Sequence, residues 1–255
     1  ADQAELEKEP FQAVYSSALA SGETVEDLVD LKPNNAPRVS FIIGEDTTEG
    51  SEAATLRAGG ATLVGSLGTV MGSVSKASVS DNIAWVSKFN LVAGEFQDPG
   101  FIDGSKLSAK SKTLITQLDT YAYTFLRKFV GSNGTYHSYS YTTTPETGDF
   151  STIENNRTYD KAFRGIYLNL LPYVNSPLLV DSEGKLDLAV IKNFEKVAGA
   201  ALKTMKDSEE LSSYSVDIDP EQNVLSTSEI KVTAKIVPVG VAKQITVSLG
   251  FALSV

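Results

Sequence analysis

The chain has 255 residues, no cysteine and a formal net charge of −10 at pH 7. Its length suits one large domain or two modest ones that fold without metals or disulfides. The absence of cysteine excludes thiol nucleophiles, thiolate metal sites and disulfides, and it fits a reducing compartment or a particle assembled inside a cell. The 22 Lys and Arg residues are dispersed, so nucleic acid is not an expected partner. No window approaches ~18 uninterrupted apolar residues, so membrane insertion is not expected.

The first segments predict short elements. The opening "ADQAELEKEP" is charged, is helix-prone over residues 3–8 and lacks the apolar centre of a signal peptide, so we interpret it as a fragment boundary. Residues 11–18 predict a short buried strand, and "VEDLVDLK" predicts a brief helix. Val39 to Ile43 form a strong strand pattern. An acidic loop follows it, with carboxylates at Glu45, Asp46, Glu49 and Glu52.

The rest of the first half predicts helices and strands in alternation. Residues 53–75 are rich in small residues and predict a helix weakened by glycines. A short element at "IAWVSKF" and a strand at "GFIDG" follow. Residues 108–130 predict the clearest amphipathic helix of this half. The alternation in "GTYHSYSYTTT" is typical of a half-exposed strand.

The second half predicts two helices followed by strands. The helices cover about 159–171, ended by a proline-containing break, and about 187–206, after a turn at "DSEGK". Three strands follow at "SYSVDID", "EIKVTAKIVPVG" and "AKQITVSLGFALSV", with Gly240 as a turn residue before the last. The pattern therefore predicts an α/β (α+β) fold: a mixed-sheet body over residues 1–152 and a helix-helix-β carboxyl-terminal module over residues 153–255.

No motif in the sequence predicts catalysis. His137 is the only histidine, which excludes multi-histidine metal sites, and we interpret it as a packed or surface residue. The glycines of "GGATLVGSLG" resemble a phosphate loop, but Ser66 stands where the lysine is needed. The calcium-loop pattern that starts at Asp217 fails at Gln222 and Ser228. We therefore expect no catalytic residue, no cofactor and no metal.

One charged constellation fits contact-making better than chemistry. Arg157 and Arg164 lie close to one helical face beside Asp160, in "IENNRTYDKAFRGIYLNLLPYV". Arginine forks suit carboxylate recognition within a chain or between subunits. A salt-bridge cluster at the start of a helix inside one chain is an equal interpretation at this point.

In their order, these segments resemble the sheath protein of contractile phage tails and related injection machines, in a divergent branch of bacterial genomes and prophages. The resemblance rests on "APRVSFIIGED", on the small-residue helix after it, and on "IENNRTYDKAFRGIYLNLLPYVNSPLLVDSEGKL". It continues through the long helix ending near "LKTMKD" to the final "YSVDID" and "SEIKVTAKIVPVGVAKQITVSLGFAL". A recognisable amino-terminal arm and first domain of a whole sheath subunit are missing, so the body resembles a truncated one.

The resemblance implies a structural protein of a virion tail or injection particle, assembled in the bacterial cytoplasm. Its copies are expected to stack as rings around a tail tube protein above a baseplate, and to contract so that the tube is driven through an envelope. In that family terminal arms add strands to sheets of neighbouring copies. The carboxyl-terminal segment, with its alternating apolar residues, would have a strand edge that is either already paired or exposed and able to pair with another copy. We expect subunit contacts from Arg157, Asp160, Arg164, Ile245, Val247, Leu249 and Phe251.

Two other functions fit parts of the sequence. An enzymatic or ligand-binding α/β domain would use the acidic loop after Ile43, because ligands bind beyond the carboxyl ends of strands. A tube or baseplate protein would share the oligomerisation without the contraction.

Overall fold

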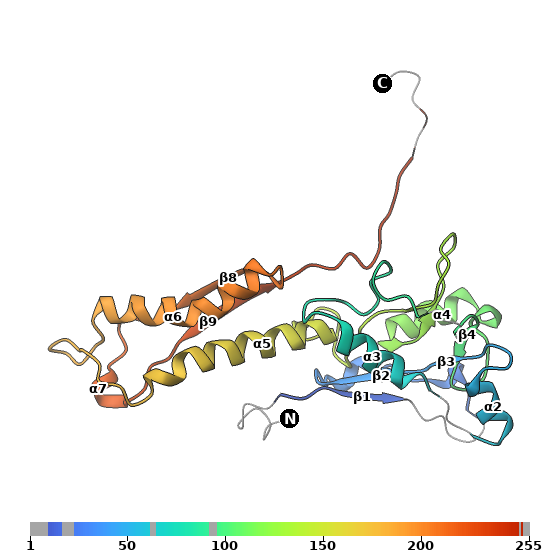
Figure 1. The fold of residues 1–255 in the computed structure, drawn as a ribbon, viewed down its shortest axis with the longest axis horizontal. Coiled ribbons are helices and arrows are strands. Elements are labelled where there is room, and N and C mark those ends of the chain that lie inside the picture. The colour runs from blue at the N-terminus through green and yellow to red at the C-terminus, as the bar shows by residue number, and fades with distance from the viewer. Residues whose placement is uncertain (1–9, 17–22, 62–64, 92–95, 250, 252–255) are drawn as a thin grey trace.

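The computed structural model describes residues 10–16, 23–61, 65–91, 96–249 and 251 of the chain. Figure 1 shows an elongated molecule in which a module of long helices projects from a body of small sheets and short helices. We use "body" for the residues up to 152 and "module" for those from 153 onward. Helices and several small sheets occur together, so the predicted α/β (α+β) class is confirmed. The helix predicted over residues 3–8 lies outside the described residues.

The body is organised on a three-stranded parallel sheet in the order β1-β2-β5, made of β1 (Ala13–Ser16), β2 (Val39–Ile42) and β5 (Tyr123–Thr124). The side chains of β2 alternate between buried and half-buried, as expected of a strand between two packed layers. Ile42 is fully buried in a cluster with Val70 and Ile83. The strand predicted from Val39 is therefore confirmed and ends one residue early.

Among the described residues, two antiparallel strand pairs and three helices complete the body. The strand pairs are β3 (Gly44–Asp46) with β4 (Pro99–Phe101), and β6 (Leu126–Arg127) with β7 (Tyr136–His137). The helices are α2 (Glu52–Ala58), α3 (Leu67–Lys76) and α4 (Lys112–Thr120). Short 3₁₀ turns lie at Val25–Asp27, Lys32–Asn34 and Leu107–Ala109. The rings of Phe101 and Phe125, whose centroids lie 5.9 Å apart, are fully buried in the larger core cluster of the body.

The module packs two long helices against a two-stranded sheet. Its helices are α5 (Ile153–Leu170) and α6 (Leu188–Asp207), and its strands are β8 (Leu211–Asp217) and β9 (Thr233–Pro238). A 3₁₀ turn, Leu171–Tyr173, and the short α7 (Val224–Thr227) lie at the end remote from the body (Figure 1). Helix α6 contacts both α5 and β8. β8 and β9 pair antiparallel, with Tyr214 opposite Ile236.

Local signals explain where the long helices begin. The Asp187 side chain accepts a hydrogen bond from the backbone N–H of Ala189 at 2.7 Å, which caps α6 close to its predicted start. The side chain of Thr152 caps α5 through the N–H of Asn155. Helix α5 therefore begins at Ile153, before the predicted residue 159.

No helix among the described residues combines the length and apolar character that crossing a bilayer requires.

The long helix predicted over residues 108–130 is wrong. Only Lys112–Thr120 is helical, and Ala122 has a positive φ of 67°, which a helix cannot continue through. The chain then supplies β5 and β6, whose residues are buried on both faces apart from Arg127. The short, mostly apolar stretch of residues 121–126 fits a buried strand as well as a helix, and in the structure it pairs with β2 and β7.

Two further predictions need correction in the body. Residues 53–75 form the separate helices α2 and α3 instead of one helix, and residues 62–64 between them lie outside the described residues. The segment "GTYHSYSYTTT" is buried, with half-burial only at Tyr139 and exposure at none of its described side chains. Its polar side chains point into the interior because backbone groups there need partners: Thr142 Oγ1 donates to the carbonyl of Phe150 at 2.8 Å.

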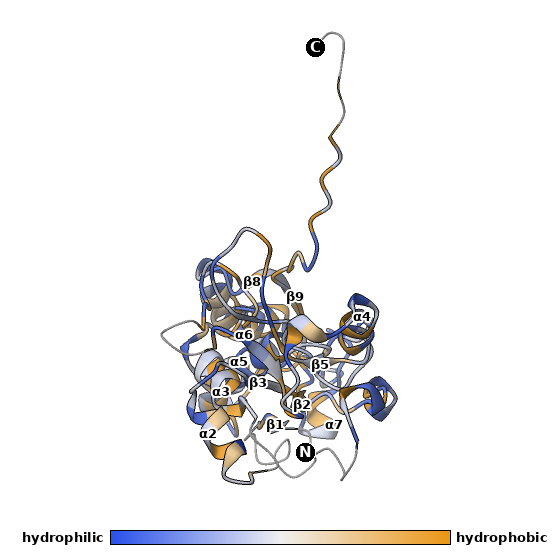
Figure 2. Ribbon diagram, turned by 90° about the vertical axis from the view of Figure 1, so that its right-hand side faces the viewer, coloured by the Kyte–Doolittle hydropathy of each residue, from blue (hydrophilic) through white to orange (hydrophobic). Residues whose placement is uncertain are grey.

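The last predicted strand is not formed over residues 242–249 and 251, and its remaining residues, 250 and 252–255, lie outside the described part of the chain. Residues 239–249 and 251 have no ladder partner among the described residues, and the segment leaves β9 and extends away from the rest of the molecule (Figures 1 and 2). A β-strand needs a neighbour to pair its backbone groups. The alternation that predicted the strand is visible in Figure 2 as alternating apolar and polar residues along the extended chain.

Candidate assembly surface

The predicted Arg157 lies where the module meets the body. Its guanidinium donates to the carbonyl of Ser78 at 3.0 Å and to the carbonyl of Ala77 at 3.1 Å, at the end of α3. Carbonyls at a helix carboxyl end lack intrahelical donors and carry partial negative charge, so a cation is favourable there. Arg157 therefore contacts backbone carbonyls within this chain.

Asp160 forms a bidentate ion pair that the sequence does not predict. Its carboxylate accepts hydrogen bonds from both terminal nitrogens of Arg38, one of them at 2.7 Å. The side chains are only 13% and 15% exposed. Arg38 precedes β2, so the pair ties the first turns of α5 to the central sheet of the body. Sequence spacing holds no signal for a pair of residues separated by 122 positions.

Arg164 lies apart from these contacts. It is exposed on α5 and makes no ion pair with the described residues. Near it, α5 presents an exposed row of large apolar side chains at intervals of four residues, made of Tyr159, Phe163, Tyr167 and Leu171, the last in the 3₁₀ turn that follows the helix. Side chains four apart share one helical face. A helical face of this composition is typical of a surface that another element covers.

The four predicted contact residues near the carboxyl end are exposed. Ile245, Val247, Leu249 and Phe251 have relative exposures of 81%, 81%, 95% and 110%. In an extended chain residues of this spacing point to the same side. A row of large apolar side chains in full contact with water is unfavourable by roughly 1.5–3 kcal/mol for each side chain, relative to burial. The structure thus leaves a strand-like apolar segment without a partner in the described part of its own chain.

The sheet of the module has open edges that match such a segment. β8 and β9 pair with each other alone among the described strands, so each keeps one row of backbone N–H and C=O groups unpaired. Exposed edges of this kind accept an extended segment from another chain. The segment and the edges are complementary in chemistry.

The acidic loop after Ile43 does not converge on a binding site. Glu45 is buried and paired with Arg57, whose Nε lies 3.2 Å from Oε1. Asp46 is also buried and accepts from the backbone N–H groups of Thr48 and Phe96, each at 3.0 Å. Both carboxylates are therefore used in holding the loop.

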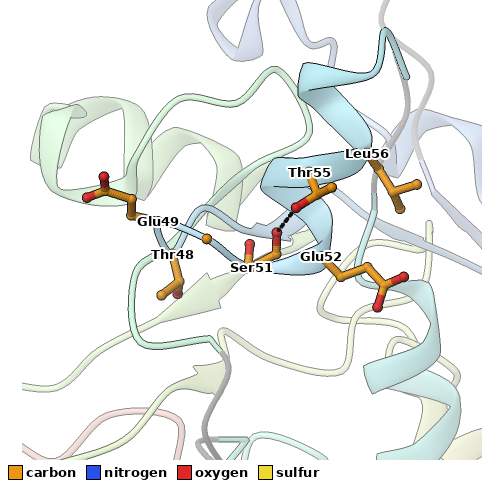
Figure 3. A pocket seen from close by; sticks show the side chains of 7 residues that line it. Thr48, Glu49, Ser51, Glu52, Thr55 and Leu56 are labelled. Carbon is orange, nitrogen blue, oxygen red and sulfur yellow. Dashed lines mark hydrogen bonds between the residues drawn. The ribbon is translucent and has the colours of Figure 1, made fainter.

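The remaining carboxylates of this loop flank a shallow hollow at the start of α2. Figure 3 shows Glu49 and Glu52 pointing in different directions, away from a common centre. The contact drawn there joins Thr55 Oγ1 to the carbonyl of Ser51 at 3.1 Å, which belongs to the helix itself. Within the described ranges no group of three or more His, Cys, Asp or Glu side chains could hold a metal ion.

His137 is a packed core residue. Its side chain is fully buried, and Nε2 lies 3.3 Å from Ser73 Oγ on α3. Burial lowers the pKa of His137 to about 4, because the charged imidazolium loses its hydration. Nδ1 has no hydrogen-bond partner among the described residues, so no carboxylate orients the ring as a catalytic triad requires. His137 and Ser73 are both buried inside the body, away from any substrate in solution.

Solved structures with the same fold come from contractile particles. The chain matches the helical sheath of the anti-feeding prophage (AFP) in its contracted state, with a TM-score of 0.63 and 14% identity over 97% of this chain and 64% of that chain. It matches the contracted PVC sheath complex of an extracellular contractile injection system with a TM-score of 0.62 and 13% identity, over 94% and 64% of the two chains. The sheath tail protein of Desulfitobacterium hafniense matches with a TM-score of 0.54 and 10% identity, over 94% and 52%.

These likenesses confirm the predicted sheath-like fold. The chain spans less than two thirds of the length of those solved chains. No curated protein matches the sequence at a significant level.

The sequence itself matches two family models in succession. Residues 11–140 match the DUF2586 N-terminal domain, and residues 149–255 match the DUF2586 C-terminal domain. The first of these matches alone covers more than half of the chain. The chain therefore belongs to the DUF2586 family.

Proposed function

We propose that the protein is the structural subunit of a contractile tail sheath, which polymerises around a tail tube and contracts to drive the tube through an envelope. The proposal includes the division into a body over residues 1–152 and a carboxyl-terminal module over residues 153–255. It also includes a tail tube protein and baseplate proteins as partners, and assembly in the bacterial cytoplasm of a virion tail or injection particle.

One observation carries the proposal: an exposed, alternating apolar segment occurs in the same chain as a two-stranded sheet with unpaired edges. Each copy can give its segment to the sheet of the next copy and receive one from another. Such a heterologous exchange joins copies in open rows or rings. The likeness to sheath chains over almost the whole length of this chain supports the same role.

The proposed task uses no substrate and no catalytic residue. Contraction can use free energy that is stored when the subunits assemble in a metastable arrangement and released when they repack. Arg157 and Asp160 fit this role as residues that hold body and module together. Arg164 and the segment from Ile245 to Phe251 are the proposed contacts between copies.

Electron microscopy of the full-length protein, alone and with a tail tube protein from the same genome, tests the proposal. Rings or tubes that form with rising concentration and enclose the tube protein are expected. Attachment of single copies to baseplate proteins, without tubes, would contradict the sheath role and favour a baseplate part. A protein that stays monomeric at every concentration and beside both partners would contradict assembly altogether.

A further inference from the structure

The segment that follows β9 is attached to the body at Lys243. Its ammonium lies 3.1 Å from Asp119 Oδ2 and 3.3 Å from Glu146 Oε1. The same nitrogen lies 5.2 Å from the ring centre of Tyr139 and 4.8 Å from that of Tyr141. We call the four body residues Asp119, Tyr139, Tyr141 and Glu146 the Lys243 socket.

The Lys243 socket is built from three separate parts of the body. Asp119 belongs to α4, the tyrosines follow β7, and Glu146 lies in the loop before α5. Tyr141 donates its hydroxyl hydrogen bond to Asp119 Oδ1 at 2.7 Å, which fixes that carboxylate. Burial and nearby carboxylates raise the pKa of Tyr141, so the phenol remains a donor. Two carboxylates and two aromatic faces converge on one ammonium, which is the chemistry that recognises a lysine.

The pKa of Glu146 responds to the two lysines beside it. Burial alone raises the pKa of this carboxyl group, but Lys243 and Lys32 outweigh that effect and hold the pKa below its ordinary value. Lys32 lies 3.4 Å from the same oxygen and belongs to the body. Glu146 is therefore paired with one lysine of the body, Lys32, and one lysine of the module, Lys243.

The attachment changes what the following segment can do. Consecutive strands pair with each other in roughly two thirds of cases, and Gly240 after β9 would permit a turn back onto the free edge of that strand. The alternation of Ile245, Val247 and Leu249 suits such a third strand. Instead, the chain crosses from β9 to the body, bends at Lys243 and then extends away from both (Figure 1).

We infer that the Lys243 socket holds the root of the carboxyl-terminal segment open, so that residues 244–249 cannot fold back on their own β9 and remain available to a second copy. The ion pairs and the cation–π contacts compete with one intramolecular strand pairing. Loss of the contacts shifts this balance toward the closed form by about tenfold. Availability to a second copy rests on the proposed function, but the open and closed forms are properties of the single chain.

The attachment can be tested directly at a concentration where the chain is monomeric. A carbodiimide joins a carboxylate to a neighbouring amine by loss of water, so it should link Lys243 to Asp119 or Glu146. Mixing chains of two isotopic compositions separates links within a chain from links between chains. Same-isotope links from Lys243 to either carboxylate are expected. Their absence, or links only between differently labelled chains, would overturn the inference.

Hydrogen exchange of the variant Lys243→Glu tests the consequence. In the variant the segment should close onto β9. A tenfold shift from a mostly open wild type makes the two forms about equally populated, so the amides of residues 244–249 that face β9 should exchange about twofold more slowly than in the wild type. Lys196→Glu makes the same change of charge on an exposed position of α6 and should leave exchange unchanged. Equal exchange of this segment in both variants would contradict the inference.

Assembly separates this inference from the proposed function. If the isolated chain shows the links and the exchange changes, and the full-length wild type assembles while Lys243→Glu does not, both are supported. If the monomer results hold and the wild type never assembles, the inference stands and the sheath role fails. A Lys243→Glu chain that assembles as well as the wild type shows that the socket does not control availability, which overturns the inference.

Discussion

The carboxylate of Asp160 on α5 and the guanidinium of Arg38 before β2 form a bidentate pair across the junction of module and body. Both side chains are largely removed from water, so neither can recover its hydration if the other is lost. This pair therefore couples the orientation of α5 to the central sheet.

Replacement of Arg38 by alanine is expected to lower the free energy of unfolding by about 2 kcal/mol, because it leaves the Asp160 carboxylate partly buried without its counterion. Urea denaturation followed by circular dichroism measures the change. Lys203→Ala removes one member of an exposed pair with Asp207 on α6 and should cost no more than ~0.5 kcal/mol. Equal effects of the two substitutions would show that the junction pair is not special.

Gly165 allows α5 and α6 to approach closely. A Cβ atom at this position would lie 2.8 Å from the Cβ of Ala201, inside van der Waals contact. Gly165→Ala is therefore expected to destabilise the module by about 1–2 kcal/mol, despite the better helix propensity of alanine. The double variant Gly165→Ala, Ala201→Gly should recover part of this loss, which thermal unfolding can measure.

Gly72 in α3 is the matched control for that substitution. A Cβ atom there meets nothing within 4 Å. Gly72→Ala should therefore stabilise the protein by about 0.5–1 kcal/mol through helix propensity alone. A loss of stability at both positions would remove the close approach of α5 and α6 as the explanation.

His137 should make the protein sensitive to mild acid. The pKa of its imidazole is about 4 in the folded state, against an ordinary value of 6.5, so below pH 6.5 the unfolded chain binds a proton that the folded chain does not. Its contribution is fully present above pH 6.5 and is lost as the pH falls to about 4, by roughly 3 kcal/mol in total. His137→Gln should remove this part of the pH dependence.

Denaturation of wild type and His137→Gln between pH 7 and pH 4 tests this. The stability difference should change in favour of the variant as the pH falls, whatever its value at pH 7. NMR of the single imidazole should show no protonation above about pH 5. Protonation near pH 6.5 in the folded protein would contradict the burial argument.

The two faces of the carboxyl-terminal segment should differ in importance for assembly. Val247→Asp puts a charge in the apolar row, and Thr246→Asp puts the same charge on the opposite side of an extended chain. Both residues are exposed, so the stability of the monomer should change by less than ~0.5 kcal/mol in each case. Val247→Asp should reduce assembly at least tenfold and Thr246→Asp much less, as measured by sedimentation. Equal loss with both would exclude pairing through one apolar face.

The parts of the fold that the sequence predicts are those set by local signals. Asp187 caps α6, and the helical spacing of apolar residues over about 187–206 gives nearly its observed bounds. The strand β8 also follows its pattern. By contrast, the helix ends before Ala122 where the chain begins to pair with β2, which lies far away in the sequence, and with β7. Tertiary pairing overrides the helical periodicity there.

The candidate contacts show the same division. Helical spacing and charge make Arg157 and Asp160 candidate subunit contacts, which stays a prediction. Their partners within this chain, Ser78 and Arg38, belong to distant segments, and the sequence pattern does not point to them. The Lys243 socket could not be predicted from the sequence for the same reason. Its tyrosines and carboxylates form no recognisable motif, and only the fold brings them together. Exposure of the carboxyl-terminal segment also follows from the fold, because alternation predicts a strand without stating who supplies the neighbour.

Helix α5 belongs to both parts of the molecule at once. Its first residue, Ile153, is buried in the same cluster as Ile42, Val70 and Ile83 of the body, whereas Ala162 packs in the module. The helix runs unbroken to Leu170, a length of ~27 Å. No flexible linker therefore separates the module from the body. A force applied to the remote end of the module is transmitted along a rigid helix directly to the packed side chains inside the body.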